Sequence, residues 1–312
     1  MRILVIGAGA IGGYFGARLL EAGRDVTFLV RPKRAEALAK GLSVRSKLGD
    51  IDRKSVVTVT SDKLDGVFDV ILLSCKAHDL NAAISSFEPA VGPNTAILPL
   101  LNGMRHIELL NERFGMERVL GGQCMISATL DKEGRVVHLS DVHVLTFGEQ
   151  DGSLSERIRT IDAVLSGAKF VPRLSDKILQ EMWEKWVFIA TTAGITCLMR
   201  GSIGDIVAAG AAELPLALFE ECSRIATSQG FSPGPEFIER TRAMVTMPGS
   251  SLTASMLRDI EQDAVIEADH VLGDLLRRVD ETQAPLLRAA YKHAKVHEHR
   301  RKRESMSFAR AS

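Results

Sequence analysis

The sequence lacks several features that mark whole classes of protein. It has no excess charge of either sign, because 39 lysines and arginines balance 39 aspartates and glutamates. Partners such as nucleic acids and anionic membranes select for a basic face, so a zero net charge argues against both. No apolar run reaches the roughly 18 residues that a membrane-spanning helix needs. We therefore expect a cytoplasmic protein without a nucleic-acid or membrane partner.

Cysteine is scarce and scattered. The chain has four cysteines, which form no C-x-x-C pair and no metal-ligand spacing with histidine. Three of them lie in apolar stretches, so we interpret them as small buried side chains. The sequence therefore predicts no metal site and requires no oxidising compartment.

The first part of the chain alternates between short apolar runs and helical patterns. The first run ends at a glycine, and a helical pattern over Ile11–Ala22 follows it, with Gly23 at its end. Such alternation favours a parallel, doubly wound sheet, because parallel strands need helical crossovers. The predicted strands are Arg2–Ile6, Asp25–Arg31, Val67–Cys75 and Thr95–Leu101.

The pattern changes twice further along. From Cys124, short β-runs separated by turn residues predict an antiparallel extension, which Lys169–Val171 is expected to close. After Ser175 only helical patterns follow, and the first of them, Asp176–Met199, is apolar nearly all round, as in a buried central helix. We therefore expect an α/β domain (1–173), an all-helical domain (174–296) and a basic, disordered tail (297–312).

A glycine-rich segment follows the first predicted strand and opens the first predicted helix. It reads Gly7-Ala8-Gly9-Ala10-Ile11-Gly12 and matches G-x-G-x-x-G. In this context Gly7 permits a tight turn, Gly9 lets the backbone approach a pyrophosphate, and Gly12 lets helix and strand pack. The alternative is a glycine-rich turn without a ligand. The strand–turn–helix context favours a dinucleotide site in a Rossmann domain, formed by Gly7, Gly9, Ala10, Ile11 and Gly12.

The end of the second predicted strand indicates which dinucleotide binds. NAD enzymes usually place a carboxylate there to bind the ribose 2′-hydroxyl. This chain has Val30-Arg31-Pro32-Lys33-Arg34 and no carboxylate. Arg31 can instead make a bidentate contact with a 2′-phosphate, so we expect NADP(H). A solvated basic turn is the alternative.

Lys185 is the first candidate catalytic residue. On a helix its neighbours on the same face are Ile178, Met182 and Ile189, all apolar. A lysine on such a face is costly unless its amine reaches water, an anion or a substrate. From the residues alone, a lysine that snorkels to the solvent explains this position at least as well.

Two further polar residues fit either a site or a structural role. Glu267 is expected on a helical face with Ile260, Ala264 and Val271, where a carboxylate needs a partner, and a salt bridge would serve. Ser255 can bind a ligand or simply N-cap the short helix that begins after it.

The whole chain resembles the ketopantoate reductase family (2-dehydropantoate 2-reductase). The resemblance spans roughly residues 1–270, in the family's order and spacing, and no single motif carries it. The matching segments are GAGAIGGYFGARL, Arg31, VILLSCKA ending near Lys76, Leu101-Asn102-Gly103-Met104, GRVVH ending at His138, Trp183-Glu184-Lys185, Ser255-Met-Leu-Arg-Asp259 and Ile266-Glu267-Ala268-Asp269.

The resemblance implies a role for each matching polar residue. Lys185 would be the general acid that protonates the substrate oxygen, and Glu267 would hydrogen-bond the substrate hydroxyl. Ser255 would hold the substrate carboxylate, and Asn102 would lie beside nicotinamide and substrate. Lys76 would lie near the cofactor ribose.

These roles predict an NADPH-dependent reductase that converts 2-dehydropantoate to (R)-pantoate in pantothenate and coenzyme A biosynthesis. The best-known members of the family carry asparagines four and eight residues after the lysine, whereas this chain has Ile189 and Ala193. That departure keeps open a second hypothesis, a reductase of another branched 2-keto acid. A non-catalytic NADP(H)-binding sensor is a hypothesis of a different class. The expected partner is a small 2-keto acid, and the apolar helices are as compatible with a homodimer as with a monomer.

Overall fold

The computed structural model describes residues 1–311, with side chains up to Ser305, and divides into two compact units. Unit 1 contains residues 1–101 and 106–179. Unit 2 contains Asn102–Arg105 and the chain from Gln180 onwards. Unit 1 extends past the expected boundary at residue 173 and includes Ile178. Ile178 packs closely against Gly121, since a Cβ added to Gly121 would lie 2.6 Å from the Ile178 Cγ2 atom.

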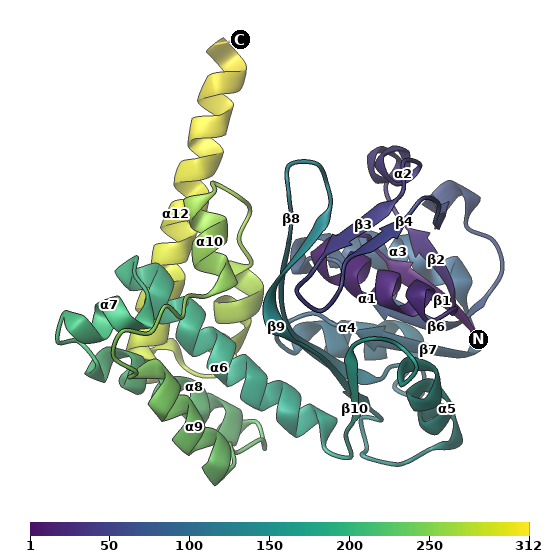
Figure 1. Cartoon of the computed structure of the whole chain (residues 1–312). Coiled ribbons are helices and arrows are strands. Elements are labelled where there is room, and N and C mark those ends of the chain that lie inside the picture. Colours follow the sequence, from purple (N-terminus) through teal and green to yellow (C-terminus); the bar gives the residue numbers. More distant parts are fainter. Residues whose placement is uncertain (312) are drawn as a thin grey trace. The chain divides into compact units, whose positions relative to one another are not determined.

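Unit 1 is built on a five-stranded parallel sheet in the order β5-β2-β1-β6-β7, coloured purple to teal in Figure 1. Strand β1 pairs with β2 on one side and with β6 on the other, so the segments that follow these three strands emerge at one edge. The central strands are almost entirely buried, which explains their continuous apolar runs. The strands are β1 (Arg2–Ile6), β2 (Asp25–Leu29), β5 (Val57–Val59), β6 (Phe68–Leu73) and β7 (Val91–Pro99).

The expected antiparallel extension is present, and it forms a second sheet. Its strands β8 and β9 pair antiparallel in a long hairpin, whereas β9 also pairs parallel with β3 and β10. Helix α1 (Ala10–Glu21) contacts strands of both sheets, and apolar residues of both join one core, so α1 separates the two sheets. The strands are β3 (Leu42–Arg45), β4 (Ile51–Arg53), β8 (Gly121–Leu130), β9 (Val136–Gly148) and β10 (Val171–Leu174).

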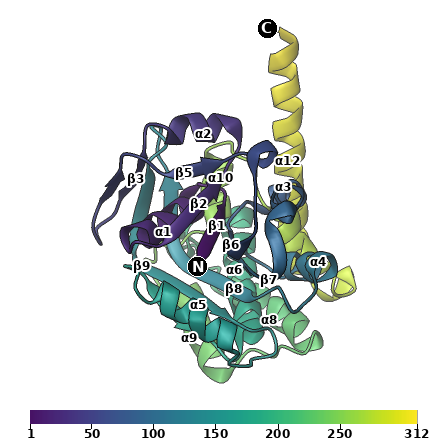
Figure 2. The ribbon, with the colours of Figure 1, turned by 90° about the vertical axis from the view of Figure 1, so that its right-hand side faces the viewer.

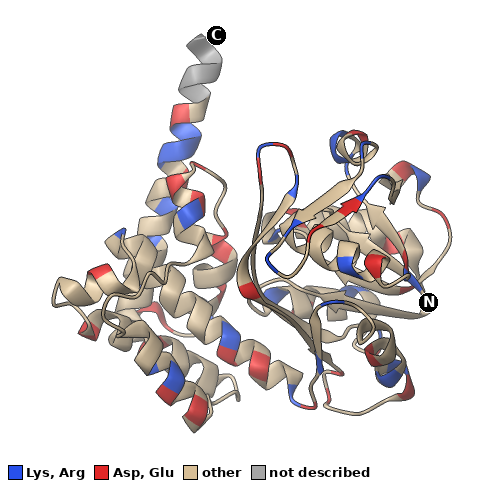
Figure 3. Ribbon diagram, viewed as in Figure 1, with Lys and Arg blue, Asp and Glu red and all other residues tan. Residues whose placement is uncertain are grey.

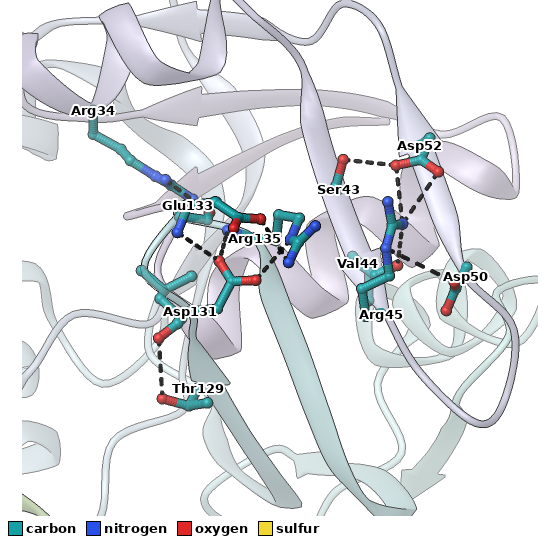
Figure 4. Close-up of polar contacts among 12 residues, drawn as sticks. Arg34, Ser43, Val44, Arg45, Asp50, Asp52, Thr129, Asp131, Glu133 and Arg135 are labelled. Atoms are coloured by element: carbon teal, nitrogen blue, oxygen red, sulfur yellow. Dashed lines mark hydrogen bonds and ion pairs between the residues drawn. The ribbon is translucent and has the colours of Figure 1, made fainter.

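The turn between β8 and β9 is fixed by one carboxylate (Figure 4). Asp131 accepts hydrogen bonds from the backbone amides of Glu133 and Arg135, at 3.0 and 2.8 Å, and pairs with the Arg135 Nε atom at 2.7 Å. These contacts hold the pKa of Asp131 below its usual range, chiefly through the Arg135 hydrogen bond. The remaining helices of this region, labelled in Figure 2, are α2 (Pro32–Leu38), α3 (Leu80–Phe87), α4 (Arg105–Phe114) and α5 (Glu156–Leu165).

Unit 2 is helical, as the sequence predicts. Its helix α6 (Ile178–Met199) is buried on most sides, with Trp186, Val187 and Ala190 fully buried, and packs as the expected central helix. Within residues 1–311, no helix has both the length and the apolarity to cross a bilayer. The other elements are α7 (Ile203–Ala208), α8 (Glu213–Ser228), α9 (Pro235–Val245), α10 (Ser255–Glu261), a π-helix η4 (Asp269–Gly273), α11 (Asp274–Leu276), a short 3-10 helix η5 (Glu281–Gln283) and α12 (Pro285–Ala311).

The basic stretch after residue 296 differs from the disordered tail expected from the sequence. Helix α12 continues through it to Ala311, and only residue 312 lies outside the described residues. Figure 3 shows both basic and acidic residues on this part of α12, and two ion pairs join residues one turn apart: Lys295 with Glu298 at 2.5 Å and Arg300 with Glu304 at 3.8 Å. Such pairs, together with residues of high helix propensity, stabilise an exposed helix, so the basic run alone did not indicate disorder.

Candidate active site

The glycine-rich segment forms the expected tight turn between β1 and α1. Gly7 has a φ of +87°, which favours glycine, and its amide donates to the Leu29 carbonyl at 2.9 Å. A Cβ on Gly12 would lie 2.1 Å from the Gly7 carbonyl oxygen and 2.2 Å from Ser74 Oγ, so only glycine fits. Gly9 is the N-cap of α1, and nothing lies within 4 Å of where its Cβ would be. The turn therefore leaves space for an anion at the amino end of α1, where Ala10 and Ile11 form the first turn.

Two candidate cationic residues follow the strands on either side of β1. Arg31 comes after β2 and Lys76 after β6, and both side chains are exposed. The guanidinium of Arg31 forms an ion pair with Asp79, with 2.5 Å between Nη2 and Oδ1. Arg31 thus has a carboxylate partner, which the sequence alone did not predict.

Arg34 is a functional candidate that the sequence analysis did not single out. Its Nε donates to the Ala8 carbonyl at 2.9 Å and its Nη1 to the Gly134 carbonyl at 3.1 Å, so it ties the glycine turn to the β8–β9 hairpin. Its Nη2 is buried without a hydrogen-bond partner among the described residues. Burial lowers the pKa of Arg34, and a buried cationic nitrogen beside this turn is a fitting partner for an anionic ligand.

Lys185 lies on α6 in unit 2 and is half-buried. The predicted apolar surroundings are confirmed, because Ile178 and Met182 are 1% and 3% exposed. The two positions that depart from the family differ in burial: Ile189 is half-buried, whereas Ala193 is buried. The helical wall next to the lysine therefore carries apolar side chains.

Glu267 lies outside a helix, and its predicted helical face is wrong. Helix α10 ends at Glu261, and Asp263 adopts a φ of +51°, which turns the chain out of the helix. Glu267 instead immediately precedes the next helical segment, where its carbonyl accepts hydrogen bonds from the amides of His270 and Val271 at 3.1 and 2.9 Å. Its half-buried side chain is thus carried by the start of the π-helix η4.

Ser255 is exposed and is the first residue of α10. The N-cap position belongs to Ala254, which makes no side-chain capping bond. The alternative role of Ser255 as an N-cap is therefore not what the structure shows. Its hydroxyl stands at the start of the helix, where it can meet a ligand carboxylate.

Asn102 is half-buried and groups with unit 2, although the chain on both sides of Asn102–Arg105 belongs to unit 1. Its carbonyl accepts a hydrogen bond from the His270 Nε2 atom. Unit 2 therefore contains Asn102, Lys185, Ser255 and Glu267, while the glycine turn, Arg31 and Lys76 belong to unit 1. In the described part of the chain, no group of three or more His, Cys, Asp or Glu side chains could hold a metal ion.

Comparison with known proteins assigns both units to one family. The sequence model described as "Ketopantoate reductase PanE/ApbA" matches residues 3–152, and its C-terminal counterpart matches residues 177–298. The chain belongs to the ketopantoate reductase family. It is an oxidoreductase of the 2-dehydropantoate 2-reductase type, and family membership indicates a nicotinamide cofactor.

Relatives of the chain align over nearly its whole length. An uncharacterized oxidoreductase, YkpB, of Bacillus subtilis is 37% identical over 302 residues, which cover 96% of this chain and 99% of the relative. A 2-dehydropantoate 2-reductase of Archaeoglobus fulgidus is 29% identical over 282 residues, covering 90% and 91%. The crystal structure of the Methylococcus capsulatus 2-dehydropantoate 2-reductase superposes with a TM-score of 0.85 at 27% identity, covering 96% and 98%.

Proposed function

We propose that this protein reduces 2-dehydropantoate to (R)-pantoate with NADPH, in pantothenate and coenzyme A biosynthesis. The observation that carries the proposal is that one unit combines Lys185, on an apolar helical face, with Asn102, Ser255 and Glu267, at the positions that the family motifs occupy. The match of family models to both units supports it.

The cofactor site of this proposal is formed by unit 1. Gly7, Gly9 and Gly12 shape the turn, and the first residues of α1, Ala10 and Ile11, offer backbone amides to the pyrophosphate. Arg31 binds the 2′-phosphate, and Lys76 binds near the ribose. Two features of unit 1 fit this cofactor: the buried Nη2 of Arg34 and the open space at Gly9. When bound, NADPH supplies the hydride for the ketone carbon.

The residues of unit 2 handle the substrate in this proposal. As negative charge develops on the ketone oxygen, the ammonium of Lys185 stabilises it and then donates its proton to that oxygen. Ser255 binds the substrate carboxylate, and Glu267 accepts a hydrogen bond from the substrate hydroxyl. Asn102 orients the substrate beside the nicotinamide.

A second candidate substrate is another branched 2-keto acid, and the apolar Ile189 and Ala193 favour it. A panel of 2-keto acids, with NADPH oxidation followed by absorbance at 340 nm, separates the two. We expect 2-dehydropantoate to give the highest kcat/KM. A higher kcat/KM with a keto acid that lacks the hydroxyl would assign the second substrate. Cofactor binding without turnover of any keto acid would leave only a sensor.

We also propose that the protein is a homodimer, because the ketopantoate reductase of Staphylococcus aureus, which shares its fold, is described as dimeric. Light scattering coupled to gel filtration tests this against the monomer mass of 34.0 kDa. A mass of about twice that value supports the dimer, and the monomer mass at high protein concentration overturns it.

A further inference from the structure

The segment Asp269–Gly273, which follows Glu267 closely, is a π-helix, η4, rather than an α-helix. The wide turns of a π-helix are rare in proteins and often occur at functional sites. Surrounding elements hold η4 in place: Trp186 Nε1 donates to the Val271 carbonyl at 2.9 Å, and Tyr291 Oη donates to Asp269 Oδ1 at 2.6 Å. The backbone that carries Glu267 is therefore tied to α6 and to α12.

His270 provides a third tie, from η4 to the turn at Asn102. The side chain is buried, at 9% exposed, and its Nε2 donates to the backbone carbonyl of Asn102, 168 residues away in the chain. A carbonyl oxygen only accepts hydrogen bonds, so Nε2 carries the proton. Because the ring occupies a buried position, the bond is shielded from competing water.

The turn at Asn102 fits closely over this imidazole. Gly103 has a φ of +78°, and a Cβ there would lie 3.3 Å from both the Nε2 and the carbonyl oxygen of His270. The backbone can approach the ring this closely because residue 103 has no side chain. His270 and Gly103 therefore set the path of the chain at Asn102.

We propose that His270 is a positioning residue that fixes Asn102 relative to Glu267 for substrate binding. The imidazole of His270 bonds to the backbone carbonyl of Asn102. In the same turn, the backbone amides of His270 and Val271 donate to the carbonyl of Glu267. Asn102, Glu267 and His270 all lie in unit 2. This inference rests on the proposed reductase function, and it assigns to His270 no contact with the substrate.

The electrostatic surroundings suit a neutral imidazole in this role. Burial lowers the pKa of His270 below its usual value, an effect that the charge of Glu267 and the hydrogen bond to Asn102 only partly oppose. A neutral ring with its proton on Nε2 donates to the Asn102 carbonyl and places no net charge beside Glu267. The contact can thus hold the backbone of Asn102 without neutralising the charge of Glu267.

The test compares His270→Leu with His270→Gln. Leucine removes the donor, whereas glutamine can place an amide N–H near the position of Nε2. A displacement on the scale of 1 Å costs up to about 100-fold in rate, so we expect His270→Leu to lower kcat/KM for the keto acid by about 10- to 100-fold. The Kd for NADPH should stay unchanged, and His270→Gln should recover most of the activity.

The matched control is Tyr291→Phe, which removes a hydrogen bond to the same π-helix from α12 and leaves the Asn102 contact intact. Equal kinetic losses in Tyr291→Phe and His270→Leu would show that general loosening of η4 is responsible and would overturn the proposal. Failure of glutamine to rescue a folded protein would also overturn it, because it would indicate an acid–base role.

A second readout does not depend on catalysis. Hydrogen exchange followed by mass spectrometry should show faster exchange of the amides at 102–105 in His270→Leu than in the unmodified protein or in Tyr291→Phe. Unchanged exchange at 102–105 in His270→Leu contradicts the positioning role, even where no keto acid is turned over. Absence of turnover in the unmodified protein would instead refute the proposed function.

Discussion

At the scale of single residues, the ion pair between Arg31 and Asp79 leads to the first prediction. A 2′-phosphate must displace the Asp79 carboxylate from Arg31, whose side chain is 73% exposed. Exposed pairs contribute about 0–1 kcal/mol, so Asp79→Asn should tighten NADPH binding by up to about fivefold. Arg31→Ala should weaken it by about 2 kcal/mol, and NADH binding should change little in both variants.

Fluorescence titration of both cofactors against both variants measures these effects. Asp79→Asn is a useful complement to Arg31→Ala because it changes affinity in the opposite direction. An unchanged ratio of NADPH to NADH affinity in Arg31→Ala would remove Arg31 from the phosphate site, and Lys33 or Arg34 would then be the next candidates.

Glu267 leads to a second prediction at the residue scale. Glu267→Gln keeps the shape of the side chain and removes its charge, so the KM for 2-dehydropantoate should rise while the melting temperature changes little. Steady-state kinetics and a thermal scan are sufficient. A large drop in melting temperature with normal kinetics would show a structural ion pair instead.

Among single residues, local features could be predicted from the sequence, whereas contacts between distant residues could not. The glycine motif and the environment of Lys185 were predictable because each depends on neighbours within a few positions. The bond between His270 and the Asn102 carbonyl was not, because 168 residues separate them. The same holds for Arg31 and Asp79, which meet only because β2 and β6 flank β1.

At the scale of elements, the apolar face of α6 predicts relaxed specificity. A site built to bind a substrate hydroxyl rejects an analogue without it by about 10⁴-fold, whereas an apolar wall discriminates only about 10- to 200-fold. With Ile189 and Ala193 on α6, we expect 2-dehydropantoate to be preferred over 2-ketoisovalerate, within the lower range. The ratio of the two kcat/KM values with NADPH at fixed pH measures this. A ratio above about 10⁴ would show that the two substitutions do not relax specificity.

Helices and strands were predicted well where one hydrophobic period continued along the segment, and poorly where the backbone changed direction. The runs that became β1, β2 and β6 and the long helix α6 have uniform patterns and appear at nearly the expected positions. The helical face assigned to Glu267 failed because Asp263, at a φ of +51°, ends α10, and neither glycine nor proline marks the break. The antiparallel extension became a separate sheet because α1 has apolar surface on both sides and packs between the two sheets. The sequence pattern of each strand alone does not indicate to which sheet the strand belongs.

At the scale of the whole molecule, three histidines that are at least partly buried make the free energy of unfolding depend on pH. Burial is the main cause of the lowered pKa values of His143, His270 and His297. Below the unfolded value of about 6.5, the unfolded chain then binds more protons than the folded protein. The stabilisation is therefore complete above pH 6.5 and is lost as the pH falls through the folded pKa values. Carboxylates do not mask this trend, because they titrate near pH 4.

We accordingly expect the melting temperature to fall between pH 8 and pH 5.5. His143→Asn should flatten that dependence, since asparagine can keep a bond to Tyr14, whose hydroxyl lies 2.7 Å from His143 Nδ1. Thermal scans at several pH values and constant ionic strength provide the measurement. An unchanged slope in His143→Asn would exclude this residue as a contributor.

The central claim is that Lys185 supplies the proton in an NADPH-dependent reduction, and one variant tests it most directly. Lys185→Ala should bind NADPH as the unmodified protein does, because the proposed contacts to the pyrophosphate, the ribose and the 2′-phosphate belong to unit 1, whereas Lys185 belongs to unit 2. Its kcat with 2-dehydropantoate should fall by at least about 100-fold, the usual scale for a general acid. A folded Lys185→Ala protein that binds NADPH and keeps a near-normal kcat would contradict the account and leave Lys185 as a lysine that merely reaches the solvent.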